Sequence, residues 1–426
     1  MAIPPKSSPK PFDISVVGGG IAGLTLAIAL HHRNIPVTLY ERASNFHEIG
    51  AGVSFTPNAV RAMEACHPGI YKAFERVCTW NGWESKRGTW FDFLDGIAED
   101  GATFPIKTSL GQNGVHRAHF LDELTKLLPS DRIQFGKQIE DAKEDANGKV
   151  VIKFTDGTSA STDALIGCDG IRSRVRQLLV GADHPSAMPT YSHKYAYRGL
   201  VPMDKAIEAV GEERARNACM HMGPDGHMLT FPVTHGEKLN IVAFRTTDQP
   251  WDGERMTKVA RRQEALDDFK GYNSSVRKLL KLTEEELNVW AIFDLGDHPV
   301  STFYRGRICI SGDAAHATAP HHGAGAGFCI EDSAVMAELL ADDRVQASRD
   351  LEAVFAVFDA CRRERTQWLV QSSRRIGDCY EWRADGVGRD FGKIEREINE
   401  RLETISGIDL DAVCKDARED LRKRLA

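Results

Sequence analysis

A glycine-rich turn between a strand and a helix, close to the start of the chain, limits the possible folds more than any other feature. Residues 12–17 read as a buried strand, residues 24–32 have helical spacing, and residues 37–40 read as a second strand. Three glycines in the pattern G-x-G-x-x-G stand between the first strand and the helix, namely Gly18, Gly20 and Gly23. A strand, a helix and a strand in this order predict a parallel βαβ unit and therefore an α/β fold.

Each glycine of this turn has its own physical role in a dinucleotide site. The first permits the tight turn, the second lets the backbone approach a pyrophosphate, and the third lets the helix pack closely on the strand. The helix N-terminus supplies N–H donors and positive potential to phosphates. Glu41 ends the second strand and can hold ribose hydroxyls, which favours FAD or NAD, and Arg42 beside it does not reverse that preference. A glycine-rich turn without a ligand is the less favoured interpretation.

Two later segments also place small residues directly after an apolar strand. Residues 307–311 run into Asp313, which can bring a carboxylate close to a ligand. The glycine-rich stretch that then opens a helix includes Gly325 and Ala326. Residues 164–167 run into a turn with Asp169, which is followed by three arginines. A structural turn explains Asp169 well enough, but the arginines also fit an anion site.

Two further positions are open to a structural and a functional interpretation. The loop of residues 48–58 includes Gly52, and its small residues fit the close approach of a flat or bulky group as well as they fit a plain loop. Residues 115–124 open a helix with a basic start, where Arg117 is a solvated charge or, if the helix points back at the first βα unit, a cofactor contact. The sequence alone favours the solvated charge.

The order of strands and helices predicts that one domain is inserted into another. Short strands alternate over residues 81–112 and over residues 190–300, apart from a helical stretch near residues 255–287, and the chain from Leu351 onward is helical and charged. We expect an α/β protein in which a Rossmann-like FAD-binding domain carries an inserted, mostly antiparallel β-sheet substrate domain, with a helical C-terminal region. The expected boundaries are 12–80, 113–185 and 301–345 for the FAD-binding domain, 81–112 and 186–300 for the substrate domain, and 346–426 for the C-terminal helices.

Composition narrows the possible partners and the setting. The formal net charge of −7 argues against nucleic acid, because proteins that bind polyanions present a basic face. Nine scattered cysteines without CxxC spacing predict neither a disulfide framework nor a metal site, and they fit a reduced, cytoplasmic setting. Residues 1–11 lack the apolar core of a signal peptide, and no apolar run approaches the length of a membrane span. The charged C-terminal helices close the fold or form a dimer face, so we expect a monomer or a homodimer.

The three glycine-rich segments, taken together and in this order, resemble those of the single-component FAD-dependent aromatic hydroxylases. The likeness covers about residues 12–380. Within that family the chain is most similar to the salicylate hydroxylases, and fungal hydroxylases of polyketide-derived phenols, some of them dearomatising, share most of the same segments. The segments that carry this closer likeness are residues 48–58, 115–117, 195–199, 225–232 and 320–321.

This resemblance implies a role for each candidate position. The three glycines and Glu41 would hold the ADP half of a non-covalently bound FAD, and Asp313 would bind its ribityl chain. Arg117 would contact the cofactor, the backbone at Gly325 and Ala326 would face the flavin ring, and Asp169 would contact FAD and NAD(P)H. The residues that would contact the phenolate or carboxylate of a substrate are Arg198, His227 and His321.

The implied reaction uses NADH or NADPH to reduce the flavin, O2 to form a flavin hydroperoxide, and transfer of its OH group to an electron-rich ring. Salicylate would give catechol with loss of carbon dioxide. At Phe231 the dearomatising relatives tend to carry a tyrosine, which favours the salicylate type, whereas His322 beside His321 resembles the polyketide branch. A hydroxylase of a polyketide-derived phenol is the alternative, and a flavoprotein that does not hydroxylate is a more distant one.

Overall fold

The computed structural model describes residues 9–46, 52–99, 101–253 and 255–426. A six-stranded sheet forms the cofactor-binding half, with the strand order β19-β20-β12-β1-β2-β8. Its strands are β1 (Ile14–Val17), β2 (Val37–Tyr40), β8 (Ile133–Gln134), β12 (Ala164–Gly167), β19 (Tyr304–Arg305) and β20 (Ile308–Ile310). All neighbouring strands are parallel except β19 and β20. The expected α/β class and the first βαβ unit are confirmed.

The register of this sheet explains why distant motifs meet. Val17 lies opposite both Tyr40 and Gly167, and Gly167 lies opposite Ile310, so four strands end level with one another. The residues that follow these four ends are the glycine turn, Glu41, Asp169 and Asp313. In an open parallel sheet, ligands bind outside the carboxyl ends of the strands. The sheet therefore brings all four motifs to its ligand-binding edge.

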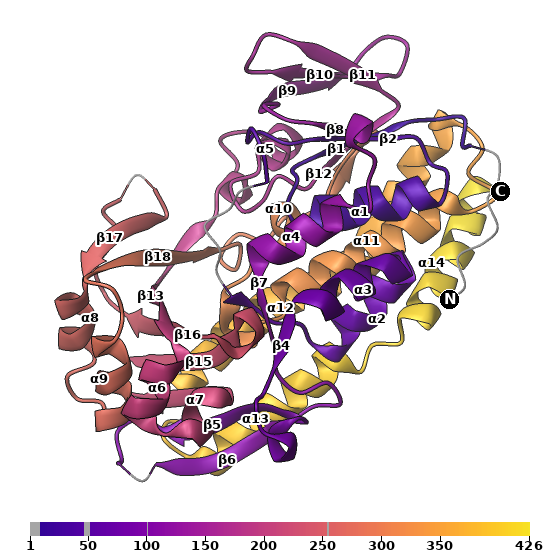
Figure 1. Ribbon diagram of the computed structural model, residues 1–426. Helices are drawn as coiled ribbons and strands as arrows, with labels where there is room; N and C mark the ends of the chain where they lie inside the picture. The colour runs from indigo at the N-terminus through magenta and orange to yellow at the C-terminus, as the bar shows by residue number, and fades with distance from the viewer. Residues whose placement is uncertain (1–8, 47–51, 100, 254) are drawn as a thin grey trace.

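Two apolar helices form the centre of the molecule beside this sheet. Helix α1 (Ile21–His32) packs along α11 (Gly325–Ala341), and Thr25 Oγ1 lies 3.0 Å from Ser333 Oγ between them. Helix α11 also packs on α2 (Pro57–Cys66), α12 (Leu351–Tyr380) and α14 (Leu410–Leu425), as Figure 1 shows. Both α1 and α11 are apolar around most of their circumference because neither has a free side.

An eight-stranded sheet forms the second half, with the order β17-β18-β13-β16-β15-β14-β5-β6. Only β14 and β5 pair in parallel. Its strands are β5 (Thr89–Asp95), β6 (Ala102–Lys107), β13 (Thr190–Pro202), β14 (Cys219–Gly223), β15 (Gly226–Val233), β16 (Lys238–Thr246), β17 (Thr257–Arg261) and β18 (Glu286–Asp294). The mostly antiparallel character is as expected, and residues 81–112 supply two of the strands. The residue boundaries of the two domains stay a prediction.

Two small sheets complete the strands. One is an antiparallel meander of β9 (Ile139–Glu144), β10 (Val150–Phe154) and β11 (Ser159–Thr162), which stands at the top of Figure 1. The other joins β3 (Gly52–Val53), β7 (Asn113–His116) and β4 (Cys78–Trp80) where the two halves meet.

Helices cover both faces of the eight-stranded sheet. One face packs on α6, α8 and α9, and the other on the end of α12 and on α13. The remaining helices are α3 (Pro68–Val77), α4 (Arg117–Thr125), α5 (Arg174–Val180), α6 (Met203–Val210), α7 (Glu212–Arg216), α8 (Arg262–Asp268), α9 (Ser274–Lys281), α10 (Asp313–His316) and α13 (Phe391–Ser406). A short 3-10 turn, η5, spans Pro320–His322. The chain from Leu351 is helical, as the sequence predicts.

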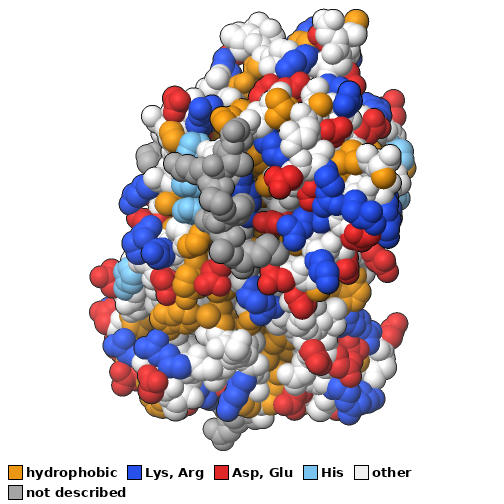
Figure 2. Space-filling view, turned by 90° about the vertical axis from the view of Figure 1, so that its right-hand side faces the viewer, with side chains coloured by type: hydrophobic (Ala, Val, Ile, Leu, Met, Phe, Trp, Pro, Cys, Tyr) orange, Lys and Arg blue, Asp and Glu red, His pale blue; other side chains and the backbone are white. Residues whose placement is uncertain are grey.

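The structure corrects two local expectations. Residues 255–287 are not one helical stretch, because β17 forms the outer edge of the eight-stranded sheet before α8 begins. Residues 115–116 end the strand β7, so the helix expected there starts at Arg117. Within the described residues, no helix combines the length and the apolar character needed to cross a lipid bilayer. Figure 2 shows acidic and basic side chains interspersed over one face of the molecule.

Candidate active site

The glycine turn has the close contacts that its sequence pattern requires. A Cβ at Gly23 would lie 1.9 Å from the carbonyl oxygen of Gly18, so only glycine lets α1 start this close to β1. Gly18 itself has φ +106°, which favours glycine, and a Cβ there would lie 2.3 Å from the carbonyl oxygen of Cys168. At Gly20 the nearest atom to such a Cβ is Nη2 of Arg117, 3.6 Å away. Gly20 therefore leaves the N-terminus of α1 open to a ligand.

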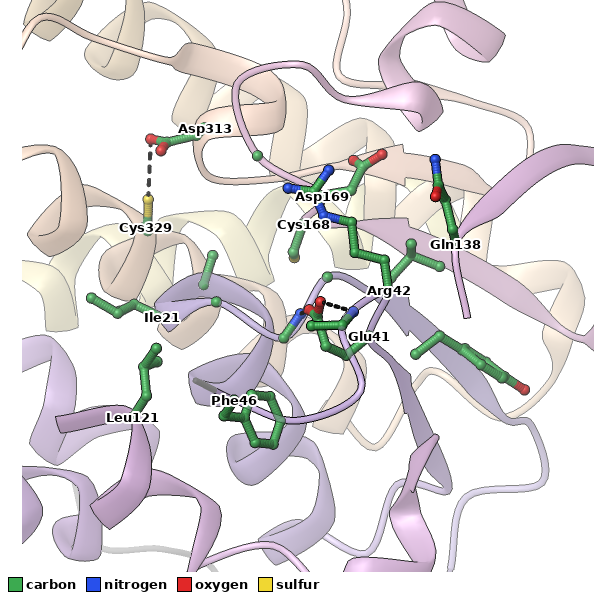
Figure 3. A pocket seen from close by; sticks show the side chains of 18 of the residues that line it. Ile21, Glu41, Arg42, Phe46, Leu121, Gln138, Cys168, Asp169, Asp313 and Cys329 are labelled. Atoms are coloured by element: carbon green, nitrogen blue, oxygen red, sulfur yellow. Dashed lines mark hydrogen bonds between the residues drawn. The ribbon is translucent and has the colours of Figure 1, made fainter. Parts of the chain in front are cut away.

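A cavity of about 560 Å³ opens at this turn and runs along the carboxyl edge of the six-stranded sheet. Figure 3 shows Asp313 and Cys329 on one side of it and Arg42 and Gln138 on the other. Its volume lies within the range typical of cofactor and small-molecule sites. The expected cofactor residues that line it are Gly18, Gly20, Glu41, Arg42, Arg117, Asp169, Asp313 and Ala326. The sheet edge thus collects most of the predicted cofactor positions in one place.

Three expected cofactor residues have other positions. Gly23 packs against the turn behind the cavity, Gly52 lies in β3 against the ring of Phe231, and Gly325 is the first residue of α11. The expected loop of residues 48–58 lies partly outside the described residues. Lining residues that the sequence did not single out as cofactor contacts include Asn45, Phe46, Leu121, Lys137, Gln138, Cys168 and Cys329.

Glu41 and Asp169 both use their carboxylates to hold the backbone. Glu41 Oε2 accepts a hydrogen bond from the N–H of Gly19 at 2.6 Å, and its Oε1 accepts one from Ala43 at 2.8 Å. Asp169 Oδ2 accepts hydrogen bonds from the N–H groups of Arg174 and Val175, and its Oδ1 accepts one from Ser173. Burial raises the pKa of Asp169, and these hydrogen bonds oppose the rise. Both acids therefore shape the cavity wall in addition to lining it.

Asp313 begins the short helix α10, and a buried ionic network fixes that helix from behind. Asp332 Oδ2 accepts hydrogen bonds from the N–H of Gly312 at 3.1 Å and from Nε2 of His316 at 2.6 Å. Arg362 donates to Asp332 Oδ1 at 2.8 Å and to Glu331 at 2.8 Å. Burial raises the pKa of Asp332, but His316 and Arg362 outweigh it and bring the pKa to about 2. His316 is thus a structural residue that holds the turn carrying Asp313.

One face of the eight-stranded sheet points toward the segment before α11. The strand register places on this face His227, Leu229 and Phe231 of β15, Asn240, Val242 and Phe244 of β16, and Ala196 and Arg198 of β13. Ala319, directly before η5, packs on Ala196, Val242 and Phe244. The face is therefore apolar, with a few polar side chains placed singly on it, as is typical of sites that bind aromatic ligands.

His227 and His321 meet where this face touches η5. Their ring centroids lie 5.2 Å apart in an edge-to-face arrangement, and the His227 ring stacks on Phe244 at 4.5 Å. His321 lies against α12 at Gly377, where a Cβ would come within 2.5 Å of its ring. Nε2 of His227 and both ring nitrogens of His321 are buried without a protein partner. Two of the three candidate substrate contacts are thus brought together with unused hydrogen-bonding atoms.

Arg198 lies on the same face, two strands away from His227. Its guanidinium stacks over the ring of Trp290, 4.8 Å from the centroid, and its Nε is buried without a partner. Burial, together with the nearby charge of Arg117, lowers the pKa of Arg198 to about 10. Among the described residues, Arg198 makes no ion pair with a carboxylate. A largely buried cation in this state favours an anionic ligand.

Sequence reasoning missed three residues behind His227. Glu381 is fully buried and lies 3.1 Å from Nδ1 of His227, and its other oxygen contacts Lys194 and Thr246. Glu381 caps the C-terminus of α12, where the helix dipole disfavours a negative charge. An acidic residue at the C-terminus of a predicted helix is the sequence signal that could have indicated a role for Glu381. No group of three or more His, Cys, Asp or Glu side chains in the described part of the chain has the arrangement of a metal site.

Comparison with known proteins relates this geometry to a family. The chain matches the family model described as "FAD binding domain" over residues 12–371. It is 47% identical to "FAD-dependent monooxygenase pigN" of Monascus ruber, over 99% of each chain. It is 39% identical to "Salicylate hydroxylase asL1" of Sarocladium schorii, over 98% of this chain and 92% of that one.

A solved structure described as "Salicylate hydroxylase substrate complex" has the same fold. It superposes with a TM-score of 0.84 at 33% identity, covering 96% of this chain and 98% of that one. The similarity therefore includes both the cofactor-binding half and the half that carries the eight-stranded sheet.

Proposed function

We propose that this chain, which belongs to the FAD binding domain family and is an FAD-dependent monooxygenase, hydroxylates a phenolic aromatic acid. The reaction uses NAD(P)H and O2. The first candidate reaction is conversion of salicylate to catechol with loss of carbon dioxide. Its support is the likeness to two proteins named as salicylate hydroxylases, one of them a solved structure.

The observation that carries the proposal is Arg198. A mostly buried guanidinium without a carboxylate partner among the described residues, on an apolar face, suits an aromatic ring that bears a negative charge. A phenolate or carboxylate would supply the missing charge and accept hydrogen bonds from the guanidinium. The apolar side chains of the face would cover the ring and exclude water.

The residues around the 560 Å³ cavity fit FAD. Gly20 leaves room at the N-terminus of α1 for a pyrophosphate, the arginines along the cavity suit its charge, and Asp313 offers a carboxylate to hydroxyl groups of the ligand. FAD, when bound, supplies the reaction with O2 that no side chain can carry out. The protein binds and orients the ring, holds its ionised form and keeps water away.

A second candidate substrate is a polyketide-derived phenol. One observation favours it: the apolar face extends over several strands. Such a substrate needs the same charge at Arg198, because hydroxylation requires an electron-rich phenolate ring. The two candidates differ in the group that the apolar face must accommodate.

Flavin-reduction kinetics across a panel of phenolic acids and acylated resorcinols, with product identification, tests the proposal. Catechol and carbon dioxide from salicylate would select the first candidate, and turnover of the resorcinols alone would select the second. If no phenol accelerates flavin reduction and none is hydroxylated, the proposal is wrong and a flavoprotein that does not hydroxylate is favoured.

The variant Arg198→Gln tests the role of the buried charge. We expect it to keep FAD and to bind the anionic substrate about 10- to 100-fold more weakly, because a hydrogen bond to a charged group contributes about 1.5–3 kcal/mol. Lys258→Gln is the control, since Lys258 also lies over a tryptophan ring, Trp251, but on an exposed edge strand. Equal substrate affinity in Arg198→Gln and the wild type would remove Arg198 from the site.

A further inference from the structure

The fully buried Glu381 requires an explanation that the fold alone does not provide. It stands at the C-terminal end of the 30-residue helix α12, where a negative charge is electrostatically unfavourable. Its backbone carbonyl already ties this end to the sheet by accepting a hydrogen bond from the N–H of Asp225 at 3.1 Å. The carboxylate is therefore not needed for that connection.

The carboxylate is paired on both sides. Oε1 faces Nδ1 of His227 at 3.1 Å, and Oε2 accepts hydrogen bonds from Nζ of Lys194 and Oγ1 of Thr246. Burial alone would raise the pKa of Glu381, but the hydrogen bond with His227 and the charge of Lys194 outweigh it and hold the pKa well below its usual range. Glu381 is therefore ionised and accepts hydrogen bonds only.

An ionised partner determines the tautomer of His227. Because Glu381 can only accept, Nδ1 of His227 must carry the proton, which leaves a lone pair on Nε2. Burial lowers the pKa of His227, and Glu381 opposes part of that effect, so the ring is neutral near pH 7. Nε2 is buried beside His321 without a protein partner. It is an oriented, unused proton acceptor on the substrate face.

We propose that Glu381 is a positioning residue that holds His227 so that Nε2 accepts the phenol proton of the substrate, while Lys194 places a positive charge beside the pair. The inference rests on the proposed function. In this step the phenol O–H bond breaks, its electron pair stays on oxygen as the phenolate, and the proton binds Nε2. Nδ1 keeps its own proton, no atom is oxidised or reduced, and the charge formed on His227 is offset by Glu381.

Several charged or titratable groups surround His227 and Glu381, and they come from every element packed there. Lys194 is on β13, His321 on η5, and Asp378 and Tyr380 on α12. Tyr272 and Arg383 also act on Glu381 electrostatically. Glu381 raises the pKa of His227, and Lys194 lowers it. Glu381 and Lys194 therefore have opposite effects on the pH at which His227 is protonated.

These opposite effects distinguish a positioning role of Glu381 from a purely structural one, because a structural role would not move the pH profile of the reaction. Product formation requires neutral His227, so kcat/KM rises with pH through the pKa of His227. Glu381→Gln removes the group that raises this pKa, so we expect the rising limb to move down by about one pH unit. Because the base is also weaker and less well held, the plateau of kcat should fall about 10- to 100-fold. Lys194→Gln should move the same limb to higher pH.

Asp378→Asn is the matched control. Asp378 lies on the same helix and contacts the same lysine at 3.0 Å, but it is partly exposed and does not contact His227. We expect its limb to stay in place and its kcat to change by less than about fivefold, as is usual for an exposed ion pair. FAD content and the thermal midpoint of each variant establish that it is folded. If Glu381→Gln does not fold, the upward shift in Lys194→Gln decides the question.

A double-mutant cycle with His227→Ala completes the test. We expect His227→Ala to keep FAD and to lose most hydroxylation, and addition of Glu381→Gln to change kcat by less than about threefold in that background. The inference is wrong if the rising limbs of the pH profiles of Glu381→Gln and Lys194→Gln do not move in opposite directions. It is also wrong if Glu381→Gln lowers kcat as much in the His227→Ala background as in the wild type. In both cases hydroxylation by the wild type still supports the proposed function. Absence of hydroxylation by the wild type would overturn both.

Discussion

Asp313 is the acid whose position most directly links sequence to cofactor binding. It follows the carboxyl end of β20 and lines the cavity, and its helix is fixed from behind by Asp332. We expect Asp313→Ala to bind FAD about 10- to 100-fold more weakly, because it removes a charged hydrogen-bond partner from the cavity. The ratio of flavin to protein absorbance after purification and titration of the apoprotein with FAD measure the effect.

The exposed Asp343 provides the control for this change. Asp343→Ala removes a carboxylate of the same kind at a position outside the cavity, so its flavin content should equal that of the wild type. Asp313→Asn should lie between the wild type and Asp313→Ala, since it keeps a hydrogen-bonding side chain without the charge. Unchanged flavin content in Asp313→Ala would show that Asp313 does not bind the ribityl chain.

Single residues were predictable from the sequence where their role depends on neighbours in the chain. Gly18, Glu41 and Asp313 stand at or shortly after strand ends, so the strand pattern predicted that each comes close to a ligand. Glu381 and Lys194 are 187 positions apart, and they meet only because α12 returns beneath the eight-stranded sheet. Nothing near either residue in the sequence indicates that contact.

The first strand, turn and helix form the element on which the cofactor half depends, and its glycines separate two effects. Gly20 has φ −73°, and an added methyl group would find its nearest neighbour 3.6 Å away. We therefore expect Gly20→Ala to fold normally but to bind FAD weakly, since the methyl group occupies the surface that a pyrophosphate approaches. Gly23→Ala should instead destabilise the protein by about 3 kcal/mol, because its Cβ would overlap the carbonyl oxygen of Gly18.

Thermal midpoints and FAD titrations of the two variants check this separation. Gly271→Ala is a control for glycine substitution as such, because Gly271 is exposed, has no positive φ, has nothing within 4 Å of an added Cβ and does not line the cavity. A Gly23→Ala protein with a wild-type midpoint, or a Gly20→Ala protein with wild-type FAD affinity, would contradict the assignment of roles within the turn.

At the scale of elements, sequence periodicity predicted the interior strands of the eight-stranded sheet and missed the edge strand β17. Strands β13, β15 and β16 were expected from their sequence pattern, and each of them has a strand on both sides in the sheet. Strand β17 was not, since it is an edge strand with one neighbour and most of its side chains, including Val259, are exposed. Whether a short segment completes a sheet depends on the strand beside it, here β18, and the segment's own sequence does not contain that information.

Several histidines are buried in the neutral state in both halves of the molecule. Their protonation should determine the stability of the protein in mild acid. Burial lowers the pKa of His221 and of His322 to about 3, and it also lowers the pKa values of His227 and His321. All four bind a proton more readily when the chain is unfolded, where the usual value is 6.5. Their contribution is therefore fully present above pH 6.5 and is lost as the pH falls from there toward the lower folded values.

Below pH 6.5, each such histidine lowers the free energy of unfolding by up to about 1.4 kcal/mol per pH unit. The four together should therefore lower the thermal midpoint steeply between about pH 6.5 and pH 4.5. Buried carboxylates such as Asp332, whose pKa is about 2, lose their contribution only below the usual range for carboxylates, so the two windows are distinct. Thermal unfolding with FAD in excess, measured at successive pH values, gives the slope. His221→Gln should reduce that slope by about one bound proton, because His221 lies in β14 with Nδ1 unpaired and contributes its titration independently of the His227–His321 pair. A midpoint that stays constant across the window, or an unchanged slope in His221→Gln, would show that these histidines can take up protons without unfolding.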